Sequence, residues 1–206
     1  MRENEAVPTP VDGGLTLADK ASWRQAVKTI FRLIPPKTRQ RLDTGLNERL
    51  RQYLPDTTDR ILLAFHPLPD EPDLRPFLTT WIARRGSLGL PRWVDNNRLS
   101  FHRVCDLARD LIPGPAGILE PRLELPELPA AAGGWILVPG RAFSETGERL
   151  GRGAGCYDRL FPGISGEKIG IAYDFQVFPE LPTDQRDGRV DVVLTPGRLL
   201  REGKGG

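Results

Sequence analysis

The chain has 206 residues, a length that suits one folded domain with short appendages. Hydrophobic residues make up 39% of the chain and charged residues 27%, which is typical of globular proteins. The formal net charge of +2 is too small to indicate, by itself, a protein that binds nucleic acid or a membrane surface.

The composition also indicates a compartment and a domain plan. No apolar run is long enough to span a bilayer, and the polar segment 1–14 lacks the apolar core of a signal peptide. The two cysteines, Cys105 and Cys156, have neither metal-ligand nor disulfide spacing, which fits a reducing environment. We therefore expect a cytoplasmic monomer with flexible tails at 1–14 and 201–206 and a single domain over 15–200.

Two amphipathic helices are predicted first along the chain. Apolar residues recur at helical spacing after Thr16 and Asp19, a pair with the spacing of a capping box, until Pro35 ends the pattern. The second helix, over 39–54, carries a stripe of four leucines: Leu42, Leu46, Leu50 and Leu54.

Short apolar runs then alternate with helical patterns. Residues 61–65 predict a buried strand and residues 74–86 a helix that ends at Gly86. Five prolines within 112–130 predict an ordered loop or connector rather than a packed element. Further strands are predicted at 88–93, 98–104, 135–139, 168–173 and 190–196. Helices between apolar strands indicate an α/β fold with helices covering a mostly parallel sheet, although the patterns leave the strand order open.

Glycine occupies every second position of the segment GRGAG at 151–155, which directly precedes Cys156, Tyr157 and Asp158. Successive backbone N–H groups without side chains can surround phosphate oxygens, and the neighbouring Arg149 and Arg152 add charge and forked donors. A carboxylate beside phosphates suits Mg²⁺. The segment matches neither the P-loop pattern nor the dinucleotide pattern, whose third glycine is replaced by cysteine. Glycines alone would favour a tight turn, whereas the added arginines and carboxylate favour a nucleoside-triphosphate site without a P-loop.

Six segments in order resemble the 5-formyltetrahydrofolate cyclo-ligases, also called methenyltetrahydrofolate synthetases. The strongest is VPGRAFSETGERLGRGAGCYDR, which is similar to the signature segment of this family. The resemblance extends from about Lys20 to Pro196. The other five matching segments are K-x-x-x-R from Lys20, PDEPD, LPRW, AGILEP, and IGIAYDFQV together with LPTDQRDGRVDVVLTP. It implies a three-layer α/β fold of the NagB/RpiA/CoA-transferase type, with helices on both faces of a mostly parallel sheet.

The resemblance also implies a reaction. Members of the family use ATP and Mg²⁺ to close 5-formyltetrahydrofolate into 5,10-methenyltetrahydrofolate, with release of ADP and phosphate. ATP phosphorylates the formyl oxygen, N10 of the folate attacks the activated carbon, and phosphate leaves. The implied partners are therefore small-molecule substrates, with no nucleic acid and no membrane.

Carried over residue by residue, the resemblance implies three groups of site residues. Without the resemblance, the simpler interpretations would hold. Lys20 and Arg24, four apart on a helix, would belong to a solvated helix face. Glu71 would be an exposed loop acid, and His66 would only line a pocket. The implied ATP site consists of Lys20, Arg24, Arg149, Leu150, Gly151, Arg152, Gly153, Ala154, Gly155, Cys156 and Tyr157. The implied folate site consists of His66, Glu71, Arg152 and Cys156, and the implied Mg²⁺ ligands are Asp158 and Asp191.

Cys156 is the main departure from the family pattern, which has tyrosine at this position. An aromatic wall on the folate side is thereby lost, unless Trp93 substitutes for it. The alternative function is therefore a catalytically weak or silent relative that still binds nucleotide or folate. A nucleic-acid-binding module built on the arginines of 39–51 and 84–86 is disfavoured by the low net charge and by the absence of RNA-module motifs.

Overall fold

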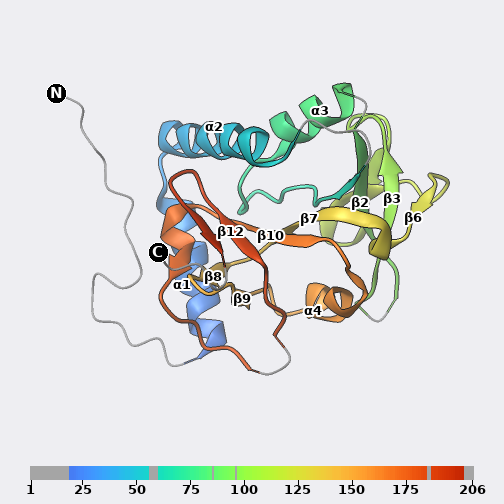
Figure 1. Cartoon of the computed structure of the whole chain (residues 1–206). Coiled ribbons are helices and arrows are strands. Elements are labelled where there is room, and N and C mark those ends of the chain that lie inside the picture. The colour runs from blue at the N-terminus through green and yellow to red at the C-terminus, as the bar shows by residue number, and fades with distance from the viewer. Residues whose placement is uncertain (1–18, 56–59, 85, 96, 185–186, 202–206) are drawn as a thin grey trace.

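A computed structural model describes residues 19–55, 60–84, 86–95, 97–184 and 187–201. Within these residues, eight strands form one central sheet in the spatial order β13-β12-β10-β7-β1-β2-β3-β6 (Figure 1). The strands are β1 (Ile61–Leu63), β2 (Ser87–Trp93), β3 (Leu99–Val104), β6 (Glu127–Leu128), β7 (Gly133–Pro139), β10 (Glu167–Ile171), β12 (Val192–Leu194) and β13 (Leu199–Arg201). The stretch from β12 to β2 is parallel, and antiparallel strands join it at both sides. The predicted mostly parallel sheet is confirmed.

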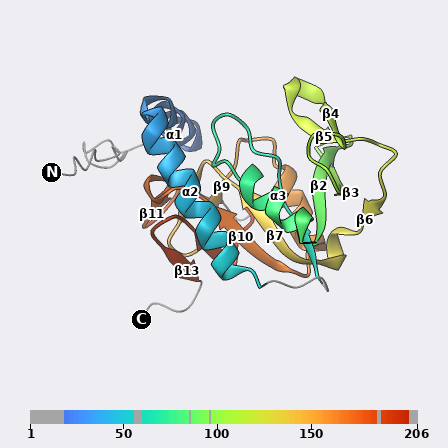
Figure 2. The same ribbon diagram turned by 90° about the horizontal axis from the view of Figure 1, so that it is seen from above.

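Helices cover both faces of the sheet, as Figures 1 and 2 show. On one face lie α2 (Pro36–Tyr53) and α3 (Arg75–Ala83), with α1 (Lys20–Leu33) beside them, and on the other lies the short α4 (Cys156–Leu160) with the 3₁₀ turn η3 (Phe161–Gly163). A three-stranded sheet of β8 (Ala142–Ser144), β9 (Arg149–Leu150) and β11 (Val177–Phe178) lies between α1 and α4. The helices on both faces agree with the three-layer arrangement that the resemblance implied.

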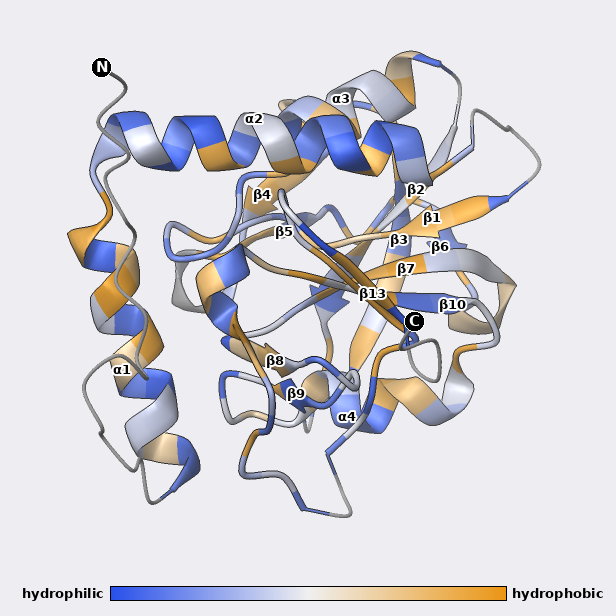
Figure 3. Cartoon of the chain, turned by 60° about the vertical axis from the view of Figure 1, so that its left-hand side comes forward, coloured by the Kyte–Doolittle hydropathy of each residue, from blue (hydrophilic) through white to orange (hydrophobic). Residues whose placement is uncertain are grey.

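Two hydrophobic clusters follow from the alternation of side chains along each strand. Leu62 belongs to the cluster under α1, α2 and α3, whereas its neighbour Leu63 belongs to the cluster on the α4 face. In the hydropathy colouring of Figure 3 the central strands β1 and β7 are mostly hydrophobic, while α2 carries many hydrophilic residues. The sheet is therefore buried on both faces, as parallel sheets require.

The start of α1 differs from the prediction. Asp19 is itself the N-cap, because its carboxylate accepts hydrogen bonds from the backbone N–H groups of Ala21 and Ser22, at 2.8 Å each. The predicted capping box, with Asp19 three residues inside the helix, is therefore wrong, and Thr16 lies outside the described residues. The leucine stripe of α2 is confirmed at Leu46 and Leu50, which are fully buried.

The proline-rich segment contains more structure than predicted. Strands β4 (Leu111–Pro113) and β5 (Leu119–Pro121) form a two-stranded ribbon around the turn η1 (Pro115–Gly117), and β6 pairs with β3 at the edge of the central sheet. The prediction of an unpacked connector is therefore wrong in part. Proline is tolerated here because it stands at strand ends, where its missing N–H breaks no ladder. The remaining 3₁₀ turns are η2 (Ala130–Ala132) and η4 (Asp174–Gln176).

The predicted tails lie almost entirely outside the described residues. Residues 1–14 and 202–206 are not described, and Arg201 is the last residue of β13. In the ranges that the structure describes, no helix has both the length and the apolar character needed to cross a membrane.

We expect the Ile169→Val variant to lose about 1 kcal/mol of unfolding free energy, because one buried methylene is removed and a small cavity is left. Ile169 is fully buried in β10 under the helices. Urea denaturation followed by circular dichroism measures the change. The control is Leu33→Ala, which removes more atoms from a residue that is 65% exposed on α1 and is expected to change stability by less. An equal loss in both variants would contradict this account of the core.

Candidate functional site

A cavity of about 280 Å³ lies at the carboxyl ends of the parallel strands. Five residues at the ends of three strands line the cavity. Phe65 and His66 come after β1, and Trp93 is the last residue of β2. Pro139 is the last residue of β7, and Gly140 follows it. Ligands of open α/β sheets bind at this end of the strands. The position therefore makes this cavity the candidate site.

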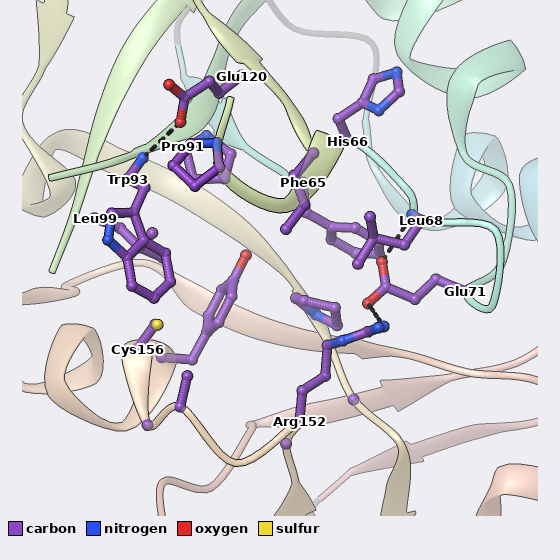
Figure 4. Close-up of a pocket in the computed structure, with 18 of the residues that line it drawn as sticks. Phe65, His66, Leu68, Glu71, Pro91, Trp93, Leu99, Glu120, Arg152 and Cys156 are labelled. Carbon is purple, nitrogen blue, oxygen red and sulfur yellow. Dashed lines mark hydrogen bonds and ion pairs between the residues drawn. The ribbon is translucent and has the colours of Figure 1, made fainter. Parts of the chain in front are cut away.

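One wall of the cavity is apolar. Figure 4 shows Trp93, Leu99 and Cys156 together at one side, opposite Glu71 and Arg152. Burial raises the pKa of the Cys156 thiol, so its side chain is neutral in this wall. Cys156, which the resemblance implies for both the ATP and the folate site, therefore lies on the cavity side of α4, next to Trp93.

Glu71 is a buried carboxylate, not the exposed loop acid of the simpler interpretation. It is 5% exposed, and its Oε2 accepts the backbone N–H of Leu68 at 3.0 Å while its Oε1 accepts a hydrogen bond from Arg152 at 3.2 Å. Burial raises the pKa of Glu71, although the Leu68 N–H and the Arg152 charge oppose the rise. His66 also lines the cavity, but in Figure 4 its imidazole points away from Glu71, and burial and Arg75 lower its pKa.

The segment 151–155 forms an exposed loop with unusual backbone geometry. Gly153 has a φ of 108° and Gly155 a φ of 69°, values that L-residues with side chains rarely adopt. In the part of the chain that the structure describes, no group accepts a hydrogen bond from the backbone N–H groups of 152–155. Four donors are thus available to a ligand, as the predicted phosphate loop requires.

Of the two predicted cations of α1, Arg24 contacts this loop, whereas Lys20 pairs with another segment. The Nε of Arg24 donates to the backbone oxygen of Gly151 at 2.8 Å. The Lys20 ammonium forms ion pairs with Asp187 and, at 3.0 Å, with Asp184. Burial would lower the pKa of Lys20, but the hydrogen bonds to these two carboxylates raise it, so this lysine is charged.

Arg149 is buried beneath the loop instead of facing solvent. Its guanidinium donates to Asp158 Oδ1 at 2.6 Å and to the backbone oxygen of Pro139 at 3.2 Å. The guanidinium carbon also lies over the rings of Tyr157 and Phe161, at 5.5 and 5.6 Å from their centroids. Its Nε is buried and has no hydrogen-bond partner among the described residues. Of the other predicted loop residues, Leu150 has its side chain in the hydrophobic core, while Gly151, Ala154 and Tyr157 line the cavity.

The two predicted metal ligands have different partners. Oδ1 of Asp158 accepts from both Arg149 and the backbone N–H of Gly188, the latter at 3.1 Å. Asp191 directly precedes β12, at the amino end of the parallel strands, and binds the backbone N–H and the ammonium of Lys168 at 2.7 and 3.1 Å. Within the described ranges, no group of three or more metal-ligating side chains comes together. The structure therefore connects Asp158 with the loop but does not bring Asp191 to it.

Two further acidic residues were missed from the sequence: Glu120 lines the cavity, and Asp70 contacts the lining residue Arg152. Asp70 pairs with Arg141 at 2.6 Å and with Arg152 at 2.8 Å. Glu120 is buried in the cavity wall, where it pairs with Arg92 at 2.9 Å and accepts the backbone N–H of Trp93 at 3.1 Å. The sequence contained a signal for each residue. Glu120 is a charged residue among apolar ones in AGILEP, a segment that resembles the family, and Asp70 belongs to the acidic segment PDEPD.

Comparisons with known proteins agree with the fold and identify a family. Residues 16–196 match the model of the 5-formyltetrahydrofolate cyclo-ligase family. The chain is 29% identical to the 5-formyltetrahydrofolate cyclo-ligase of Mycolicibacterium smegmatis, over 87% of this chain and 94% of the relative, and 27% identical to that of Escherichia coli K12, over 82% and 95%. The solved structure of the Aquifex aeolicus 5,10-methenyltetrahydrofolate synthetase superposes with a TM-score of 0.80 at 34% identity, over 91% of this chain and 94% of that one. The chain therefore belongs to the 5-formyltetrahydrofolate cyclo-ligase family, a family of ligases.

Proposed function

We propose that the protein closes 5-formyltetrahydrofolate to 5,10-methenyltetrahydrofolate with consumption of ATP. The γ-phosphoryl group passes to the formyl oxygen, N10 of the folate attacks the activated carbon, and the C–O bond breaks with release of phosphate. The products are the methenyl folate, ADP and phosphate. No protein nucleophile is required, so the protein acts by positioning and by neutralising charge.

The loop 151–155 is the observation that carries the proposal. The N–H groups of 152–155, which have no partner among the described residues, belong to the loop that Arg24 contacts at Gly151. The loop borders the cavity through Gly151, Arg152 and Ala154. Phosphate oxygens bound in the loop would therefore lie next to a ligand in the cavity. In-line transfer between two bound substrates requires such adjacency.

The cavity supports the folate side of the proposal. Its apolar wall around Trp93 and Leu99 suits a flat aromatic ring, and the buried carboxylate of Glu71 suits the N–H donors of a pterin. Because Glu71 is buried, a hydrogen bond to it is worth more than one to an exposed acid.

Asp158 fits the role of a Mg²⁺ ligand. Its Oδ1 is held by Arg149 and Gly188, while its Oδ2 is directed toward the loop, 3.8 Å from the point where a Cβ on Gly155 would stand. No described residue donates a hydrogen bond to Oδ2. When bound, Mg²⁺ supplies charge neutralisation on phosphate oxygens, and Mg²⁺ commonly takes only one or two carboxylates from the protein. Asp191 is proposed as the second ligand on the family resemblance alone.

One assay tests the proposed function. Purified protein is mixed with Mg-ATP and 5-formyltetrahydrofolate, and the methenyl product is followed by its near-ultraviolet absorbance. We expect turnover that requires both ATP and Mg²⁺. Binding of ATP without turnover would contradict the enzyme assignment and favour the catalytically silent relative.

We expect the Cys156→Tyr variant to bind 5-formyltetrahydrofolate about three- to tenfold more tightly, because an aromatic ring is added to the wall next to Trp93. The KM for the folate at saturating ATP measures the effect. Cys156→Ser is the matched control, since it changes the side chain but adds no ring. An unchanged or higher KM in the tyrosine variant would mean that Trp93 and Leu99 already supply the wall.

A further inference from the structure

Arg152 connects the two halves of the proposed site. Its NH1 atom donates to Asp70 Oδ1 at 2.8 Å and to Glu71 Oε1 at 3.2 Å (Figure 4 shows the contact with Glu71). The two carboxylates belong to the loop that follows β1, whereas Arg152 belongs to the loop 151–155. A single guanidinium nitrogen thus joins the proposed folate carboxylate to the proposed nucleotide loop.

The far end of this bridge is rigid. Asp70 also accepts a hydrogen bond at 2.6 Å from the buried Arg141, whose backbone oxygen accepts from the buried Gln176 at 3.0 Å. Burial would raise the pKa of Asp70, but the hydrogen bonds from Arg152 and Arg141 lower it, so Asp70 is ionised. The Arg152 side chain, by contrast, is 43% exposed. Arg152 is therefore the end of the bridge that can move.

We propose that Arg152 couples the binding of the two substrates, and that Asp70 is the positioning residue that holds Arg152 in the ligand-free chain. This inference rests on the proposed function. Phosphate oxygens compete with Asp70 and Glu71 for the guanidinium, and pterin N–H donors compete with Arg152 for Glu71 Oε1. The first ligand opens the bridge, and the second ligand binds to a site where the bridge is already open. Each ligand therefore tightens the binding of the other, by the same factor.

Binding to the wild-type chain is the first test. The probes are 5-formyltetrahydrofolate and the Mg²⁺ complex of the β,γ-imido analogue of ATP, which cannot transfer its γ-phosphoryl group. Titration calorimetry gives the Kd of each probe alone and with the other at saturation. We expect both Kd values to fall by the same factor, on the order of tenfold. Turnover in the methenyl assay together with unchanged Kd values would overturn the coupling but leave the proposed function standing. Failure of both probes to bind would overturn both.

The Asp70→Asn variant then separates positioning from structural support. Asparagine can still accept from Arg141 through its one side-chain oxygen, but its amide NH₂ then stands in place of the carboxylate oxygen that accepts from Arg152. The analogue alone is expected to bind several-fold more tightly to this variant, and the coupling factor to fall. A purely structural role would weaken the analogue and leave the coupling factor unchanged, which would overturn the proposal. The control is Asp95→Asn, which removes one partner of the exposed Asp95–Arg98 ion pair and is expected to change neither value.

Glu71→Gln is the second variant, needed if melting experiments show that Asp70→Asn does not fold. It neutralises the other carboxylate that holds Arg152. Its own affinity for the folate is expected to fall, because Glu71 is in the proposed folate site. The informative value is the coupling factor, which is expected to approach one. A wild-type coupling factor in Glu71→Gln would overturn the proposal.

Discussion

The Asp158→Asn variant is expected to lose Mg²⁺-dependent turnover, with kcat/KM falling at least about a hundredfold. The reason is electrostatic: asparagine removes the negative charge that Oδ2 presents to the loop. The fold is expected to persist, because the amide oxygen can still accept from Arg149 and from the backbone N–H of Gly188. The measurement is the methenyl assay over a Mg²⁺ titration, with circular dichroism to check the fold.

Two comparisons make this result specific. In Asp191→Asn, the second proposed ligand is changed in the same way, and a higher Mg²⁺ requirement would support its role. If Asp191→Asn melts at a lower temperature but keeps the wild-type Mg²⁺ dependence, Asp191 stabilises the fold through its ion pair with Lys168 and is not a Mg²⁺ ligand. Wild-type turnover of Asp158→Asn at limiting Mg²⁺ would contradict the metal assignment of Asp158.

The Gly153→Ala variant is expected to bind ATP about ten- to a hundredfold more weakly. At the φ of 108° that Gly153 adopts, a side chain strains the backbone by about 1–3 kcal/mol, and the loop relieves the strain by turning N–H groups away from the phosphates. Space is not the cause, because a Cβ there would meet Arg24 at an ordinary 3.8 Å. Calorimetric titration with Mg-ATP measures the affinity.

The matched control is Gly117→Ala. Gly117 also has a positive φ, of 72°, and a Cβ there would meet no atom within 4 Å, but it belongs to η1 and not to the loop 151–155. This variant is expected to lose stability without losing affinity for ATP. Equal loss of ATP affinity in both variants would mean that global strain, not the loop, determines binding.

The fold was predictable where local patterns decide it. Apolar runs such as 61–65 and 135–139 became the buried strands β1 and β7, and the leucine stripe of 39–54 became the buried side of α2. The strand order was not predictable, because it depends on pairings between distant segments that leave no local pattern. The five prolines of 112–130 led to the prediction of a loop or connector, but this segment contains paired strands, since proline at a strand end breaks no hydrogen-bond ladder.

The site was predictable as a set of residue types but not as a set of contacts. The sequence indicated that Arg149 and Arg152 serve phosphates, yet Arg149 is buried, packs over Tyr157 and Phe161, and holds Asp158. Nothing in the order of residues distinguishes Arg149 from the exposed Arg152, three positions later. The pairing of Arg141 with Asp70 joins residues 71 positions apart, and only the folded sheet brings them together.

The strand order also has a consequence for how the chain folds as it is synthesised. Strand β1 (Ile61–Leu63) lies between β2 and β7, and its partner β7 begins only at Gly133. A nascent chain that has emerged through β2 can therefore pair only one side of β1, and closing the long intervening loop carries an entropic cost before β7 is added. We therefore infer that α1 and α2 form early by local contacts, whereas the cavity is assembled late, once β7 and the loops that follow it have been synthesised.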